Sequence, residues 1–210
     1  TLLSREGYAR KLTSMGVPAE EKDILTSGHV AAKYLANQNI NQAYVIGENG
    51  LTEELEKQEI SIVEDAEVVV AGFDRQFNYN KLKRAANILQ NGGELVLCST
   101  EKTFRTNQNL MPHQGPTNLA LKEFAEDITL VGKPSEHFQD EFRNYFSFLP
   151  TSAVLIGDRL GDMELGNNLG MTTGAVMSGD IDREMLSKAE DIQTPNFGLS
   201  SLNRLRKKVL

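Results

Sequence analysis

The chain has 210 residues, 40% of them hydrophobic and 24% charged, which is enough for a buried core without disulfides or metals. Its formal net charge of −7 argues against nucleic acid as a partner, and no apolar run approaches the roughly 18 residues of a membrane span. A single cysteine, Cys98, excludes an internal disulfide framework and leads us to expect a cytoplasmic location.

In chain order, helical and strand patterns alternate. A helix is predicted after the N-cap Ser4 and ends at Gly16, and a second begins at Thr26 or Ser27. Residues 99–115 are polar and are predicted to form a long loop. Further helices are expected at 52–57, 80–89, 116–124, 135–146, before Gly170 and at 182–189, and strands at 43–46, 67–71, 95–98, 128–131, 153–156 and 173–177.

This alternation favours an α/β fold with a mainly parallel sheet that is covered by helices on both faces. Ligand sites in such sheets lie beyond the carboxyl ends of the strands. Residues that follow directly after a strand are therefore the first candidates for a functional site.

The first such candidate is Lys133, in the segment Gly132-Lys133-Pro134 that follows a predicted strand. A lysine at this edge can bind a phosphate, Gly132 allows a close approach of backbone, and Pro134 suits the first turn of a helix. The alternative interpretation is a surface lysine in a common turn.

The second candidate is the pair Asp158 and Asp162, in the segment Gly-Asp-Arg-Leu-Gly-Asp after the next strand. Asp158 ends the predicted strand, and Asp162, four positions later, falls in the first turn of the next helix. This spacing places their carboxylate oxygens near one point, and Mg²⁺ prefers such oxygen ligands. The alternative is that both aspartates stabilise the start of a helix through its dipole.

Together the two motifs resemble the haloacid dehalogenase phosphatases, in particular the 4-nitrophenylphosphatase and sugar-phosphatase branch with a large α/β cap. The likeness covers nearly the whole chain. It is carried by Gly132-Lys133-Pro134-Ser135, by Gly157-Asp158-Arg159-Leu160 with Asp162, and by the cap segment Ala71-Gly72-Phe73-Asp74-Arg75.

The resemblance implies a Rossmann-like, three-layer core with a parallel sheet at residues 1–41 and 128–210, and an inserted α/β cap domain at 42–127. It also implies Mg²⁺-dependent hydrolysis of a small phosphorylated metabolite, such as a sugar, polyol or nucleoside phosphate, through an aspartyl-phosphate. By this likeness Asp158 binds Mg²⁺, Asp162 binds it or orients its waters, and Lys133 neutralises the nucleophile and a phosphoryl oxygen. A homodimer that pairs through the cap is a further expectation.

The chain departs from the family in its nucleophile. The motif Asp-x-Asp-Gly is absent from the 210 residues, as is the second motif, a strand ending in Thr or Ser followed by asparagines. Asp180-Ile181-Asp182 has a similar form, but Arg183 follows it and its order along the chain is wrong. We expect a β-α-β unit of roughly 30 residues before Thr1 in the native protein, carrying the nucleophile.

The histidines are weaker candidates. His113 lies in a cap loop where it can contact substrate, although a solvated loop histidine is the simpler interpretation. His29 and His137 fall on predicted helices and are expected to be surface or capping residues, and Cys98 is expected to be a small buried hydrophobe.

Two other functions compete with the phosphatase. A protein that keeps the fold without turnover would act in binding or regulation. A phosphoacceptor signalling domain also has acidic residues and a lysine at a sheet edge, but the long insertion after residue 42 argues against such a compact unit.

Overall fold

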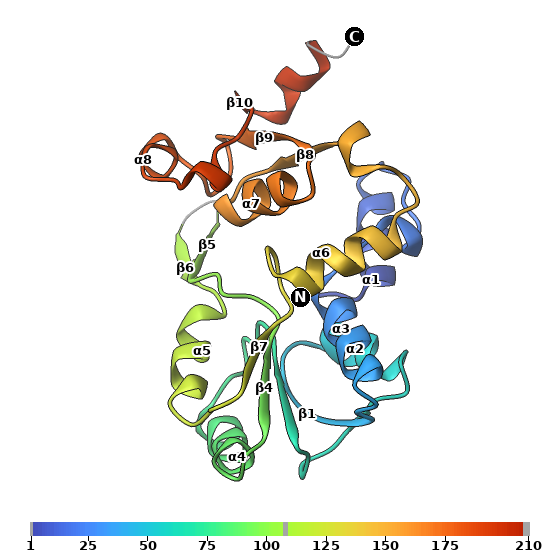
Figure 1. The fold of residues 1–210 in the computed structure, drawn as a ribbon, viewed down its shortest axis with the longest axis vertical. Helices are drawn as coiled ribbons and strands as arrows, with labels where there is room; N and C mark the ends of the chain where they lie inside the picture. Colours follow the sequence, from blue (N-terminus) through green and yellow to red (C-terminus); the bar gives the residue numbers. More distant parts are fainter. Residues whose placement is uncertain (1, 107–108, 208–210) are drawn as a thin grey trace. The chain divides into compact units, whose positions relative to one another are not determined.

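The computed structural model describes residues 2–106 and 109–207, which form two compact units (Figure 1). One unit comprises Thr1–Thr103 and Met111–Gly132, and the other comprises Phe104–Leu110 and Lys133–Leu210. These bounds differ from those of the expected core and cap because residues 1–41 and 128–132 cluster with the sheet of the first unit. The division into core and cap stays a prediction.

The first unit contains a five-stranded sheet in the order β2-β1-β3-β4-β7, in which every neighbouring pair is parallel. The expected parallel α/β arrangement is therefore confirmed. The strands are β1 (Gln42–Ile46), β2 (Ser61–Ile62), β3 (Val68–Ala71), β4 (Glu94–Leu97) and β7 (Ile128–Leu130).

Helices cover both faces of this sheet, as the strand order requires. The chain moves outward from β1 to β2 in one direction and from β3 through β4 to β7 in the other, so right-handed crossovers place their helices on opposite faces. Figure 1 shows α4 and α5 on one side, and α2 and α3 on the other. The helices of this unit are α1 (Arg5–Ser14), the 3₁₀ turn η1 (Glu21–Asp23), α2 (Ser27–Asn37), α3 (Asn49–Glu56), α4 (Tyr79–Gln90) and α5 (Gly115–Lys122).

The predicted helix starts are confirmed at two positions. The Ser4 hydroxyl accepts a hydrogen bond from the Gly7 N–H, and the Thr26 hydroxyl accepts one from the His29 N–H. Each satisfies a donor that the first helical turn leaves without an intrahelical partner.

The core of the first unit forms where α4 and α5 pack on the sheet. Tyr44, Ile46, Val69, Leu95 and Leu97 face Ala85, Ile88, Leu89 and Leu121 in one cluster. Each fully buried aliphatic side chain contributes roughly 1.5–3 kcal/mol relative to exposure. Cys98 belongs to this interior, as expected, and burial raises the pKa of its thiol to about 11.

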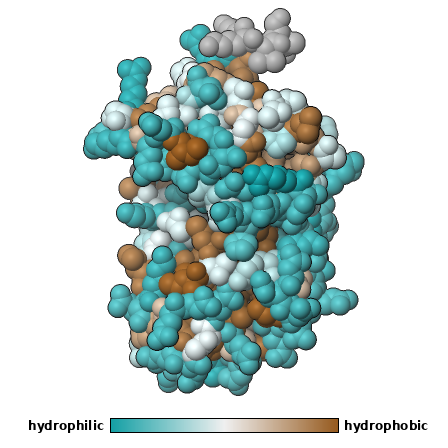
Figure 2. All heavy atoms as spheres, viewed as in Figure 1, coloured by the Kyte–Doolittle hydropathy of each residue, from teal (hydrophilic) through white to brown (hydrophobic). Residues whose placement is uncertain are grey.

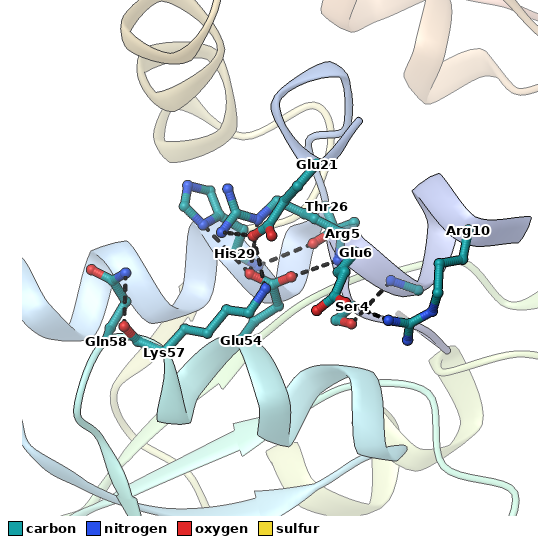
Figure 3. A network of polar contacts seen from close by, with 11 residues as sticks. Ser4, Arg5, Glu6, Arg10, Glu21, Thr26, His29, Glu54, Lys57 and Gln58 are labelled. Carbon is teal, nitrogen blue, oxygen red and sulfur yellow. Dashed lines mark hydrogen bonds and ion pairs between the residues drawn. The ribbon is translucent and has the colours of Figure 1, made fainter. Parts of the chain in front are cut away.

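The expectation for His29 is wrong. Its side chain is buried on α2, and its Nδ1 lies 3.6 Å from Oε2 of Glu54. Glu54 belongs to α3 and is 0% exposed. Arg5 holds the same carboxylate through its backbone N–H at 2.6 Å and its Nε at 2.9 Å (Figure 3). His29 is buried because α3 packs against α2 at this point. His137 is exposed, as expected.

A second carboxylate extends this cluster, which we call the Glu54 network. Glu21 accepts from Arg5 Nη2 at 2.8 Å and from Lys57 Nζ at 2.8 Å. The network therefore joins α1, η1, α2 and α3 through charges that compensate one another.

The second unit contains a three-stranded parallel sheet in the order β10-β9-β8. Helix α7 connects β8 to β9 and buries Met163 against Ala175 and Ile181. In the described part of the chain β8 pairs on one side only, and its Val154 is 54% exposed. The elements are α6 (Glu136–Tyr145), η2 (Pro150–Ser152), β8 (Val154–Gly157), α7 (Leu160–Asn168), β9 (Thr172–Val176), α8 (Arg183–Ser187), η3 (Asp191–Gln193), β10 (Phe197–Leu199) and η4 (Leu202–Lys207).

The segment 99–115, expected to be a loop, contains a small sheet. Strands β5 (Thr103–Arg105) and β6 (Leu110–Pro112) pair with each other. The Thr106 N–H also donates to the Asn109 carbonyl at 2.8 Å. This correction matters for function, because the hairpin brings residues 104–106 into the second unit.

Hydrophobic residues on the face shown in Figure 2 are scattered among hydrophilic ones. Within the described residues, no helix is both long and apolar enough to cross a membrane.

Candidate active site

Lys133 lies just beyond β7, at the point where the second unit begins. Its Nζ is 2.6 Å from Oδ1 of Asp162, and its side chain is 46% exposed while that of Asp162 is 10% exposed. The structure therefore brings together two of the residues that were singled out in the sequence. Because the ammonium group of Lys133 is partly exposed, it can turn from Asp162 toward an incoming phosphate.

Gly132 lets the chain pass close to the backbone of Cys98. A Cβ at this position would lie 2.2 Å from the carbonyl oxygen of Cys98, within the first unit. Only glycine permits so close an approach of the two backbones.

Asp158 follows β8 directly, at the carboxyl end of that strand. Its Oδ2 accepts a hydrogen bond from the Asp180 N–H at 3.3 Å, and its carbonyl accepts one from the Ile181 N–H at 2.8 Å. A Cβ on Gly179 would lie 2.2 Å from the same Oδ2. The loop after β9 is thus wrapped closely around this carboxylate.

Asp162 lies in the first turn of α7, packed against the end of β8. A Cβ on Gly157 would lie 2.4 Å from Asp162 Cβ and 2.6 Å from its Oδ2. The N-cap of α7 is Arg159, which makes no side-chain capping bond. Since Asp162 bonds Lys133 and Asp158 bonds the Asp180 N–H, both aspartates have contacts that helix capping does not explain.

These residues fit a divalent cation that is shared with a substrate. Across residues 2–106 and 109–207, no group of three or more His, Cys, Asp and Glu side chains is placed to enclose a metal. Mg²⁺ commonly takes one or two carboxylates and completes its octahedron with waters and phosphate oxygens. Asp158 and Asp162 suit that arrangement, with Lys133 as a cation for the remaining phosphoryl charge.

A cavity of about 510 Å³ lies beside Asp158, within the second unit. It was not predicted from the sequence. Its lining comes from the hairpin, the β8 end and the loop after β9: Phe104, Arg105, Thr106, Asp158, Arg159, Ser178, Gly179 and Asp180.

Asp180 organises one wall of this cavity. Its Oδ2 lies 2.6 Å from Arg159 Nη2, and its Oδ1 accepts from the Arg105 N–H at 2.9 Å. The sequence pattern directed attention to Asp180 only as part of an Asp-x-Asp pair. Its place just after β9, at the carboxyl edge of the sheet, is the signal that could have found it.

His113 belongs to the first unit, not to the unit that holds Lys133, Asp158 and Asp162. Its ring is partly buried and stacks on Phe73, with centroids 4.9 Å apart and an interplanar angle of 14°. A contact between His113 and substrate stays a prediction.

Comparison with known proteins identifies the family at both ends of the chain. A model of the haloacid dehalogenase-like hydrolases matches residues 1–61, and a second, HAD-hydrolase-like model matches residues 130–205. The chain belongs to the haloacid dehalogenase superfamily. The second match includes Lys133, Asp158 and Asp162, the three residues of the candidate site.

Several relatives and solved structures that resemble the chain are named as phosphatases or as a nucleotidase. It is 27% identical to 5′-nucleotidase YutF of Bacillus subtilis over 92% of this chain and 77% of that protein. It matches 4-nitrophenylphosphatase from Thermotoga maritima with a TM-score of 0.87 and 27% identity, over 100% of this chain and 81% of that one. It also matches glycerol phosphate phosphatase from Mycobacterium tuberculosis in complex with calcium, with a TM-score of 0.84 and 26% identity, over 96% and 62%.

Proposed function

We propose that the protein is a Mg²⁺-dependent phosphatase of small phosphomonoesters, such as sugar, polyol or nucleoside phosphates. The observation that carries the proposal is the 2.6 Å contact between Lys133 Nζ and Asp162 Oδ1 at the carboxyl edge where Asp158 follows β8. Use of a divalent cation is supported by the family and by the calcium complex of the glycerol phosphate phosphatase, and its place at Asp158 and Asp162 is part of the proposal. That the cation is Mg²⁺ is proposed from the oxygen ligands of the site.

Each residue has a separate task in this scheme. Asp158 and Asp162 would hold the cation. Its positive charge would offset the negative charge of the transferred phosphoryl group. Lys133 neutralises a second phosphoryl oxygen, and its pairing with Asp162 fixes its position before substrate enters. Gly157 and Gly179 leave room for the two carboxylates. A side chain at Gly157 would clash with Asp162, and one at Gly179 would clash with Asp158.

The proposed chemistry proceeds in two steps. An aspartate oxygen attacks phosphorus, the bond to the ester oxygen breaks, and the leaving alkoxide takes a proton from a general acid. Water then attacks the aspartyl-phosphate and releases inorganic phosphate. Residues 1–210 contain no Asp-x-Asp-Gly motif for the attacking group. Within the described residues, β8 has one unpaired edge. A strand that carries the attacking aspartate could pair there.

The test is a phosphatase assay on the protein expressed from its complete coding sequence. Hydrolysis of 4-nitrophenyl phosphate is expected with Mg²⁺, and it should disappear with EDTA and in Asp158→Asn. Full activity of that variant would refute the role of Asp158. An absence of any hydrolysis would favour the second candidate, a binding or regulatory protein that keeps the fold without turnover.

Two further expectations belong with this proposal. A cytoplasmic location is supported by Cys98, which is the single cysteine of the sequence, is buried and has no second cysteine with which to form a disulfide. A homodimer through residues 42–127 is proposed from the family resemblance alone. Light scattering after size exclusion tests it, and a monomeric mass would contradict it.

A further inference from the structure

The cavity beside Asp158 contains more than the proposed phosphate chemistry uses. Lys133, Asp158 and Asp162 account for the transferred phosphoryl group and its cation. Arg105, Arg159 and Asp180 remain, and they line the same 510 Å³ cavity. A volume in this range suits a small ligand group.

Asp180 contacts both arginines, Arg159 through its side chain and Arg105 through its backbone. One of its carboxylate oxygens holds the Arg159 guanidinium at 2.6 Å, and the other holds the backbone N–H of Arg105 at 2.9 Å. Its own backbone N–H donates to Asp158. The hairpin that carries Arg105 is therefore tied, through one residue, to the carboxylate assigned to the metal.

The charges in the cavity do not balance once these contacts are made. Asp180 neutralises Arg159, and Asp158 is assigned to the cation. Arg105 is exposed, and within the described residues its guanidinium makes no ion pair, although Asp158 and Asp180 line the same cavity. Its positive charge is thus available to a ligand.

We propose that this cavity binds a second anionic group, a carboxylate on the leaving group of the substrate, and that Arg105 selects for it. The inference rests on the proposed function, because Asp158 marks where the transferred phosphate lies. A guanidinium presents two parallel N–H donors that match the two oxygens of a carboxylate. Asp180 is a positioning residue for Arg105 and does not itself contact the ligand.

The test compares two esters of similar size, 2-phosphoglycolate and 2-hydroxyethyl phosphate. The first carries a carboxylate where the second carries a neutral hydroxymethyl group. In Arg105→Ala, kcat/KM for 2-phosphoglycolate is expected to fall about tenfold or more, with a change of less than about twofold for 2-hydroxyethyl phosphate. Arg105→Lys should retain part of the preference. Arg183→Ala removes an exposed arginine of the same unit that does not line the cavity, and it should leave both substrates unchanged.

Equal losses on both esters, or no loss on either, would overturn the inference while leaving the phosphatase proposal intact. Failure to hydrolyse either ester would count against the proposed function. In that case calorimetric binding of the same two esters with Mg²⁺ decides the inference by itself. Tighter binding of 2-phosphoglycolate that depends on Arg105 supports it, and equal binding of the two esters overturns it.

Discussion

Two clusters in this protein pair basic with acidic side chains, one buried and the other partly exposed. In the Glu54 network the carboxylate is 0% exposed, and Arg5 is 11% exposed at the side chain. In the pair Lys133 and Asp162 the cation is 46% exposed. A buried network in which each charge is compensated holds helices together, whereas a pair with one exposed partner can exchange that partner for a ligand. Burial of the cation therefore separates the structural cluster from the functional one.

The largest effect expected is on activity, at Lys133. Lys133→Ala should lower phosphatase activity by about 100-fold or more, because it removes the cation that we propose neutralises the phosphoryl group. Its unfolding free energy should change by less than about 1 kcal/mol, since pairs this exposed contribute little. Urea unfolding and steady-state kinetics on the same preparation measure both quantities.

The matched control is Lys188→Ala, which breaks an exposed pair with Glu184 in the same unit. It should leave both activity and stability near those of the unmodified protein. An active Lys133→Ala, or one that unfolds readily, would remove the distinction between the two clusters.

The buried network should respond in the opposite way. Glu54→Gln leaves the Arg5 charge inside the protein with Glu21 as its remaining carboxylate, and it should lower the unfolding free energy by about 3 kcal/mol. The exposed neighbour Glu56→Gln should stay within about 0.5 kcal/mol. A Glu54→Gln variant as stable as the parent would mean that the network holds nothing together.

Acid sharpens the same contrast. Burial by itself would raise the pKa of Glu54, but His29 and the N–H and charge of Arg5 outweigh it and lower the pKa from 4.5 to about 2. A carboxyl whose folded pKa is lowered stabilises the fold above its unfolded pKa, and this contribution is lost as the pH falls.

We therefore expect on the order of 3 kcal/mol of stability to disappear between about pH 4.5 and 2. Unfolding by urea at a series of pH values measures this. Glu54→Gln should show a flatter dependence across that window, and an unchanged slope in the variant would assign the acid sensitivity to other carboxyls.

A smaller effect is expected at Gly157, where the site depends on a missing side chain. Gly157→Ala places a methyl group 2.4 Å from Asp162 Cβ, which must displace the Asp162 side chain that contacts Lys133. A cost of about 1–3 kcal/mol in stability is expected, with a loss of activity. Gly198→Ala, in open space on β10, is the control and should change neither quantity. Full activity of Gly157→Ala would show that the Lys133–Asp162 contact is not required.

Much of the sheet could be predicted from the sequence, because buried parallel strands such as β3 consist of continuous apolar residues and the helices between them carry caps. Lys133, Asp158 and Asp162 could be found for a related reason. They follow strands directly, and the carboxyl ends of parallel strands are where such folds bind ligands.

The rest depends on pairings that leave no local signal. The hairpin of β5 and β6 forms from two three-residue strands in a polar segment, too short to show alternation. His29 is buried by a helix whose Glu54 lies 25 positions further along the chain. Arg159 and Asp180 are 21 positions apart, so neither reveals the other.

The most direct test of the account is calorimetric titration of Mg²⁺ in the presence of inorganic phosphate, which requires binding but no turnover. We predict saturable Mg²⁺ binding to the unmodified protein, much weaker binding to Asp158→Asn and to Asp162→Asn, and normal binding to Glu54→Gln at a temperature where it is folded. Equal binding by all four proteins would contradict a cation site at Asp158 and Asp162.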